Sequence, residues 1–340
     1  MLWRSRRCWT WVTALAFFAS EACECVADTQ DIIESTFREA IVKLVVSSAQ
    51  PVYKDGVNLC ESEGTGFLIG SNHVVTAEHV FILPKECGSP IIIVRSQSQS
   101  VERLAKVVGA KDDVAVLGMD EALPPTMCSL GLMGSDVFDT KGIRYGIPGK
   151  LRDAAIFPVR LGPKKNEFDP LVVLTPTTAE AGESGGPIIY NFNVVGILRS
   201  KHKEYKAFSF MTTVSAIRTL LSQLNLKPAG KICNPVEINM VVGLGSSATY
   251  NIVFNQRSAE SSRQEAATAL AAKLSSVPSP DVFNSLSLPK ISHSGGAVTL
   301  DVPPTVGFFP PSLDSVSTKL KEELWREYVA QREAKGWWKR

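Results

Sequence analysis

Three stretches of the sequence carry residues suited to acid–base and nucleophilic chemistry. The first ends in Thr76-Ala-Glu-His79 and follows two apolar segments that glycines flank. Histidine titrates near neutrality, so an imidazole held just beyond a strand end suits a general base. An isolated histidine is more often structural or on the surface, and we give His73, His202 and His293 that interpretation.

The second stretch is Lys111-Asp112-Asp113-Val-Ala-Val-Leu117, in which a carboxylate begins an apolar run. A buried aspartate can accept the Nδ1 proton of an imidazole and stabilise the cation that forms. Asp113 is preferred over Asp112 because it directly precedes the apolar residues. Alone this motif is weak, since an aspartate in a turn before a strand is common.

The third stretch, Ala181-Gly-Glu-Ser-Gly-Gly-Pro187, surrounds a serine with glycines that let the backbone approach a substrate closely. Such a turn can aim the N–H groups of Gly182 and Ser184 at one point, as an oxyanion hole does. Ser184 is then the nucleophile that His79 activates. The alternative is a glycine-rich loop without chemistry, and the succession of all three stretches favours the catalytic interpretation.

The elements that must hold these residues are short, apolar, rich in Val and Ile, and separated by Gly, Pro, Asn and Asp. This pattern is typical of an all-β sandwich or barrel. Residues 215–224 predict a helix with one apolar face. The expected strands lie at 41–46, 66–69, 73–76, 91–94, 104–108, 114–117, 171–174, 187–189 and 194–198.

The pattern changes at Lys227-Pro228-Ala229-Gly230, where we place a domain boundary. The predicted organisation is a leader over 1–27, the β-rich domain over 28–228, a small α+β module over 229–306 and a proline-rich linker with an amphipathic helical tail over 307–340. Within the module we expect strands at 236–242, 250–254 and 298–302 and a helix at 258–274.

The amino terminus has the character of a secretory signal: arginines, then the apolar run Trp9–Ala19, then small residues. We expect an exported protein, periplasmic or secreted, cleaved after Ala22 or Ala27. A lipoprotein box at Cys23, a twin-arginine signal and an uncleaved anchor remain alternatives.

Composition narrows the function classes further. The formal net charge is +2 without a basic stripe, so no nucleic-acid partner is expected. Cleavage after Ala27 leaves four of the seven cysteines, and an even number in an exported chain suggests two disulfides. Their spacing does not suggest a zinc site, and we predict no metal and no cofactor. The four are Cys60, Cys87, Cys128 and Cys233.

The three motifs in the order His79, Asp113, Ser184 resemble the trypsin/chymotrypsin superfamily of serine proteases. The short interval from His79 to Asp113 and the segment 208–217 resemble its bacterial HtrA/Deg-like branch, although 235–302 do not resemble that branch's PDZ domain. The resemblance covers 38–228. It implies a chymotrypsin-like double antiparallel β-barrel with the triad in the cleft, and cofactor-free hydrolysis of protein or peptide substrates through an acyl-enzyme.

The sequence departs from the family at Glu183, where Asp or Asn is commoner, and at Glu78, where Ala is commoner. No Arg-Ile-Val-Gly-Gly start is present, so activation by a new amino terminus is not expected. The cysteines that bracket His79 resemble the family's histidine-loop disulfide, which implies that Cys60 pairs with Cys87. Cys128 and Cys233 would then form the second pair, with free thiols as the alternative.

By the same resemblance the substrate pocket has its base near Thr178 and a wall near Arg199. The absence of an aspartate at 178 argues against cleavage after Lys or Arg. Arg199 would attract an acidic side chain, whereas a preference for small aliphatic or polar side chains is the favoured alternative.

Two other function classes remain open: a catalytically silent scaffold with the protease fold, and a chaperone-like quality-control protein. The tail carries Trp325, Trp337 and Trp338 among basic residues. This predicts either contact with a membrane, the cell envelope or a partner, or docking on the protein itself. The module vaguely resembles peptidoglycan-binding modules, and an unclassified appendage is the default.

Overall fold

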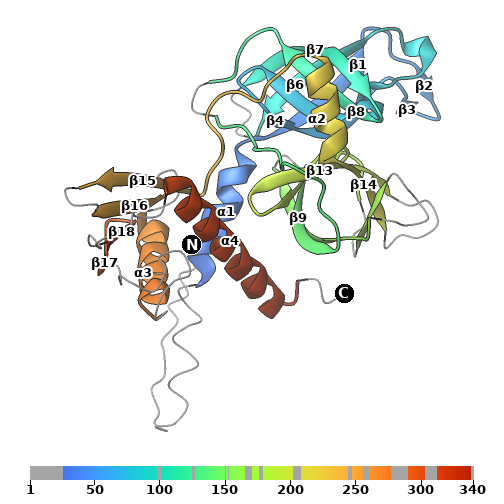
Figure 1. The fold of residues 1–340 in the computed structure, drawn as a ribbon. Helices are drawn as coiled ribbons and strands as arrows, with labels where there is room; N and C mark the ends of the chain where they lie inside the picture. Colours follow the sequence, from blue (N-terminus) through green and yellow to red (C-terminus); the bar gives the residue numbers. More distant parts are fainter. Residues whose placement is uncertain are drawn as a thin grey trace, which may run out of the picture.

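The structure is a computed structural model in which two closed, six-stranded antiparallel β-barrels lie one above the other (Figure 1). It describes residues 26–97, 101–124, 127–149, 151, 153–164, 171–175, 179–201, 208–243, 247–255, 260–276, 290–302 and 312–337. The double-barrel, mostly β fold class expected from the sequence is confirmed. Most of the predicted leader, together with Thr178 and residues 303–311 of the proline-rich linker, lies outside the described residues.

The first barrel has the strand order β1-β4-β5-β8-β7-β6. Its inward side chains are mainly Val, Ile and Leu, whose branched shapes pack well on a pleated surface. A short hairpin of β2 (Tyr53–Lys54) and β3 (Val57–Asn58) and the 3-10 turns η2 (Glu78–Phe81) and η3 (Lys85–Cys87) lie in its connections. The six barrel strands are β1 (Ile41–Ser48), β4 (Ser62–Leu68), β5 (His73–Ala77), β6 (Pro90–Ser96), β7 (Glu102–Lys111) and β8 (Val114–Met119).

The second barrel has the order β10-β11-β14-β13-β12-β9. Helix α2 (Val214–Gln223) follows its last strand and buries Ile217, Leu220 and Leu221, as its apolar spacing predicted. The strands are β9 (Thr140–Gly146), β10 (Ala155–Leu161), β11 (Val172–Thr175), β12 (Pro187–Tyr190), β13 (Asn193–Lys201) and β14 (Ser209–Thr213).

The C-terminal module is a four-stranded antiparallel sheet in the order β15-β16-β18-β17, packed against helix α3 (Glu260–Ser276). Strand β17 was not predicted, because its sequence, Lys-Ile-Ser-His-Ser, is mostly polar and exposed. The strands are β15 (Val236–Val242), β16 (Ala248–Phe254), β17 (Lys290–Ser294) and β18 (Ala297–Val302).

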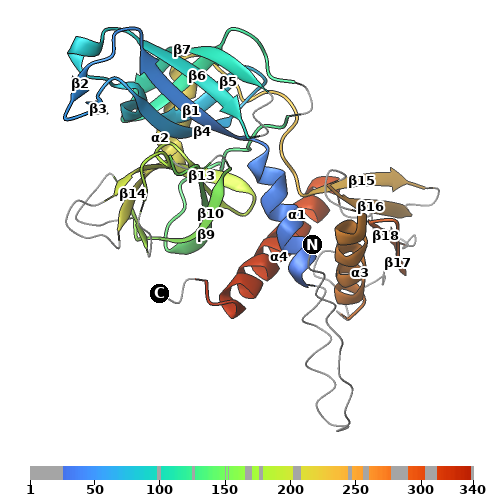
Figure 2. The same cartoon turned by 180° about the vertical axis from the view of Figure 1, so that it is seen from behind.

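Helices α1 (Val26–Arg38) and α4 (Leu313–Ala334) lie between the second barrel and the module, as both views show (Figure 2). Helix α1 packs against α3 and α4 and buries Ile32, Ile33 and Phe37. The start of the predicted 28–228 domain therefore contacts the C-terminal elements, and the domain boundaries stay predictions. In the described part of the chain, no helix combines the length and the apolar character that crossing a membrane requires.

Candidate active site

Asp113 occupies the tip of the hairpin that joins β7 to β8. Lys111 pairs with Val114 across the hairpin, which leaves Asp112 and Asp113 as a two-residue turn. Both have positive φ, 54° and 62°, the geometry of a type I′ turn, and aspartate is among the few residues that tolerate it. Strand β8 also pairs with β5, through Val114 and Ala77, so the tip of the hairpin lies beside the residues that follow β5.

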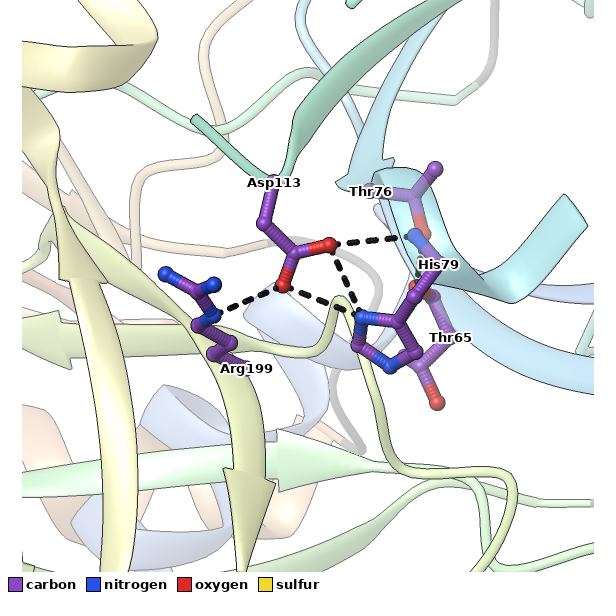
Figure 3. Close-up of polar contacts among 5 residues, drawn as sticks. All are labelled: Thr65, Thr76, His79, Asp113 and Arg199. Carbon is purple, nitrogen blue, oxygen red and sulfur yellow. Dashed lines mark hydrogen bonds and ion pairs between the residues drawn. The ribbon is translucent and has the colours of Figure 1, made fainter. Parts of the chain in front are cut away.

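His79 lies in that following segment, in η2, and its ring contacts the Asp113 carboxylate (Figure 3). Its Nδ1 is 2.9 Å from Oδ1 and 3.0 Å from Oδ2, and its backbone N–H donates to Oδ1 at 3.1 Å. Because a carboxylate only accepts, this contact places the proton of the neutral ring on Nδ1 and leaves Nε2 as an acceptor. The Glu78 N–H donates to the Asp113 carbonyl at 3.1 Å and fixes the two segments together.

Ser184 belongs to a tight turn of the second barrel that packs against the strands leading to His79. Its carbonyl accepts the Thr65 N–H at 2.8 Å. A Cβ on Gly185, whose φ is +85°, would lie 2.2 Å from Thr76 Oγ1, so only glycine fits at this approach. The turn is therefore held a few residues from His79 along β5. Within the described part of the chain, the half-buried Ser184 hydroxyl forms no hydrogen bond with the His79 ring.

Two buried threonines of the first barrel lie beneath these residues, and one of them, Thr65, bonds to the second barrel. Thr76 Oγ1 donates to the Thr65 carbonyl at 2.8 Å (Figure 3). Thr65 Oγ1 donates to the Gly182 carbonyl at 2.7 Å. Thr65 Oγ1 also accepts the Ile147 N–H at 2.8 Å. Sequence analysis missed both threonines, because alternating Thr in a strand carries no signal beyond strand propensity.

The N–H groups of Gly182 and Ser184, the predicted oxyanion donors, donate to no acceptor among the described residues. Gly182 has a φ of +94°, and a Cβ there would lie 2.5 Å from the Gly149 nitrogen, so the turn needs glycine at this position. Two N–H groups without acceptors in one tight turn can donate hydrogen bonds to an oxygen that develops negative charge, and the turn need not rearrange to do so.

Beneath the turn, Glu183 forms a fully buried ion pair with Arg144 of β9. The Arg144 Nη2 is 3.2 Å from Glu183 Oε2, and both side chains are 0% exposed. Glu183 Oε2 also accepts the Glu180 N–H at 2.6 Å, and the Arg144 guanidinium stacks 4.4 Å from the centre of the Phe157 ring. This pair braces the turn from inside the second barrel, and sequence analysis did not find Arg144 because no motif surrounds it.

Arg199, predicted as a pocket wall, lies on β13 with its Nε 3.1 Å from Asp113 Oδ2. The guanidinium thus contacts the carboxylate that binds His79 (Figure 3). Its partner in the predicted pocket, Thr178, lies outside the described residues. The acidic-substrate hypothesis stays a prediction, although the structure gives Arg199 an acidic partner within the protein.

Disulfides join Cys60 to Cys87 and Cys128 to Cys233, the pairings named above. The first links the loops on either side of β4, β5 and η2. Among the described residues, no group of three or more His, Cys, Asp or Glu side chains could hold a metal ion.

Two closed six-stranded barrels with these residues at their junction define a chymotrypsin-like fold. No protein-family model and no curated protein matches the chain.

Solved structures with a similar fold include the protease Rv3671c of M. tuberculosis in its active form, at 23% identity and a TM-score of 0.46, covering 59% of this chain and 88% of that one. Its inactive form has 21% identity, a TM-score of 0.42 and coverages of 58% and 95%. A serine-to-alanine mutant of Rv3671c in the inactive form has 22% identity and a TM-score of 0.42, covering 60% of this chain and 96% of that one. At these values the likeness adds nothing to what the barrels themselves establish.

Proposed function

We propose that this chain is an exported serine endopeptidase that uses His79, Asp113 and Ser184 as its catalytic triad. The observation that carries the proposal is the Asp113 carboxylate, which accepts both the Nδ1 proton and the backbone N–H of His79. That contact orients the imidazole for use as a base, at the junction where the Ser184 turn packs against β4 and β5.

In the proposed reaction, His79 Nε2 removes the Ser184 hydroxyl proton as the oxygen attacks a peptide carbonyl. The N–H groups of Gly182 and Ser184 stabilise the resulting oxyanion, while Asp113 stabilises the imidazolium. His79 then protonates the leaving amine, and water hydrolyses the acyl-enzyme by the same route. The serine–histidine hydrogen bond is often long or absent without substrate, so its absence here is compatible with this chemistry.

Reaction with a fluorophosphonate probe tests the proposal, because such probes react with an activated serine. We expect labelling of the wild-type protein and none of Ser184→Ala. Asp113→Asn should label more slowly by about four orders of magnitude, as expected when the imidazole has the wrong tautomer. Ser215→Ala is the matched control, since Ser215 is exposed on α2. It should label at the wild-type rate.

An unlabelled but folded wild-type protein would reject this function and favour the silent scaffold. Suppression of client aggregation by Ser184→Ala protein would favour the chaperone-like role instead.

Export and the substrate class belong to the same proposal. The two disulfides support an oxidising destination. Proteins or peptides with small aliphatic or polar side chains at the cleaved position are the proposed substrates, because Arg199 is already paired with Asp113. Peptide profiling that finds cleavage after Glu or Asp would restore the acidic option.

A further inference from the structure

Arg199 and Asp113 form an ion pair between the two barrels. Arg199 belongs to β13 of the second barrel, and Asp113 precedes β8 of the first. The Nε–Oδ2 distance is 3.1 Å, and the carboxyl side chain is only 12% exposed against 37% for the arginine. A pair with one nearly buried member is screened less by salt and solvent than a surface pair.

A β-bulge aims Arg199 at this carboxylate. Strand β13 pairs with β14 through Leu198 and Ser200, and the register shifts between them, so Arg199 is the extra residue. Bulges re-aim side chains in this way and often occur next to active sites. At the bulge, Arg199 has no partner residue on β14.

The backbone next to Arg199 is tied to the nucleophile turn. The Leu198 carbonyl accepts the Gly185 N–H at 2.8 Å, and the Leu198 N–H donates to the Gly186 carbonyl at 2.8 Å. Arg199 therefore connects the segment that carries Ser184 with the carboxylate that orients His79. A shift of one barrel against the other would therefore change the Arg199–Asp113 contact as well as the Thr65 hydrogen bonds that also join the barrels.

We infer that Arg199 is a positioning residue that acts through Asp113, an inference that rests on the proposed function. The His79 N–H binds Oδ1, the His79 ring lies within reach of both oxygens, and Arg199 binds Oδ2, so rotation of the carboxylate about the Cβ–Cγ bond is restrained from both sides. The planar guanidinium presents its Nε–H to Oδ2 in a fixed geometry, so this contact holds the carboxylate in one orientation. It restrains the orientation of the imidazole and, together with the hydrogen bonds of Thr65, the distance between the barrels at the site.

The test compares the second-order rate of fluorophosphonate labelling among variants. The probe has no acidic side chain, so it reports on the triad and not on the selectivity of a pocket. We expect Arg199→Gln to label about ten- to a hundredfold more slowly, as misplacement of a catalytic group does. Arg199→Lys should recover part of the rate, because it keeps the charge but not the fixed Nε geometry. Arg160→Gln, at an exposed arginine on β10 of the same barrel, is the control.

A double-mutant cycle separates this role from a general structural one. If Arg199 acts through Asp113, then Arg199→Gln should slow labelling little further in an Asp113→Asn background. The inference is overturned if Arg199→Gln labels at the wild-type rate, if Arg199→Lys shows no recovery, or if the slowing is as large in the Asp113→Asn background. An unlabelled wild-type protein would reject the proposed function itself, whereas a labelled wild-type protein with any of these results rejects only the role of Arg199.

Discussion

Glu183 places a buried charge directly beside Ser184. Burial raises the pKa of Glu183, against the attraction of Arg144, and burial lowers the pKa of Arg144. Both shifts disfavour the charged forms, so each charge depends on the other to remain in the core. The guanidinium also leaves Nε and Nη1 buried without hydrogen bonds, which makes the remaining contact with Glu183 more important.

Removing one member of this pair should therefore be costly. We expect Arg144→Met or Glu183→Gln to lower the free energy of unfolding by about 3–5 kcal/mol, since each leaves an uncompensated buried group. Combining Arg144→Met with Glu183→Met should restore most of that stability. Urea unfolding measures this effect. Glu121→Gln, which removes the exposed partner of Arg103, is the control and should cost below about 1 kcal/mol. Single variants as stable as the wild type would contradict the expectation.

The functional residues differ in how far the sequence alone could predict them. His79, Asp113 and Ser184 stand in local motifs, so their types and neighbours pointed to them. Arg144 and Arg199 stand in ordinary strands, and their roles depend on long-range pairing and on one bulge that the sequence does not announce. Thr65 acts through hydrogen bonds to the second barrel and Thr76 through a hydrogen bond to Thr65, which no periodicity predicts.

At the scale of elements, short Val- and Ile-rich runs between turn residues predicted most of the barrel strands, although β9 and β10 lie outside the expected ranges. The polar strand β17 escaped this reasoning, and the docking of helices α1 and α4 could not be read from amphipathicity alone. Their contact is specific: Glu34 of α1 accepts the Tyr328 hydroxyl at 2.6 Å and also contacts the Arg332 guanidinium. Trp325 of α4 packs edge-on against Tyr190 and is 5% exposed, so this tryptophan docks on the protein itself.

Tyrosines at this contact should make the protein sensitive to alkali. Burial raises the pKa of Tyr145, whose hydroxyl donates to the Glu34 carbonyl at 3.1 Å, and likewise that of Tyr328. A raised pKa means that the folded state keeps its proton when the unfolded chain loses it. The contribution of each buried tyrosine to the free energy of unfolding is complete below the ordinary tyrosine pKa of about 10 and is lost as pH rises above that value.

Urea unfolding across this alkaline range should show a falling free energy of unfolding, and the buried tyrosines should contribute tyrosinate absorbance only as the protein unfolds. The Tyr145→Phe variant should lose less stability over the same range. Tyr53→Phe, at a side chain 67% exposed, is the matched control and should follow the wild type. Equal slopes for Tyr145→Phe and wild type would contradict this account.

At the scale of the whole molecule, the two disulfides have different tasks. Cys60–Cys87 spans a sequence separation of 27 and closes a loop that contains β4, β5 and η2, hence His79. Cys128–Cys233 spans 105 and closes a loop that contains the entire second barrel and α2. The second bond is reinforced by a bridge between Ser129 and Ile232 and by the Cys233 N–H, which donates to the Ser129 carbonyl at 2.8 Å. It therefore anchors the chain where it enters the C-terminal module.

Replacing each cystine by two serines should separate stability from activity. The chain-entropy model gives a loss of about 4.7 kcal/mol for Cys128→Ser with Cys233→Ser and about 3.5 kcal/mol for Cys60→Ser with Cys87→Ser, since the longer loop gains more unfolded-state freedom. Fluorophosphonate labelling should show the reverse order, because only the shorter loop contains His79 and releases the segment that presents its ring. Urea unfolding ranks the two double variants by stability, and labelling rates rank the same proteins by activity, both under oxidising conditions. A larger loss of labelling on opening the longer loop would contradict this expectation. It would mean that the Ser184 turn of the second barrel depends on Cys128–Cys233 more than His79 depends on Cys60–Cys87.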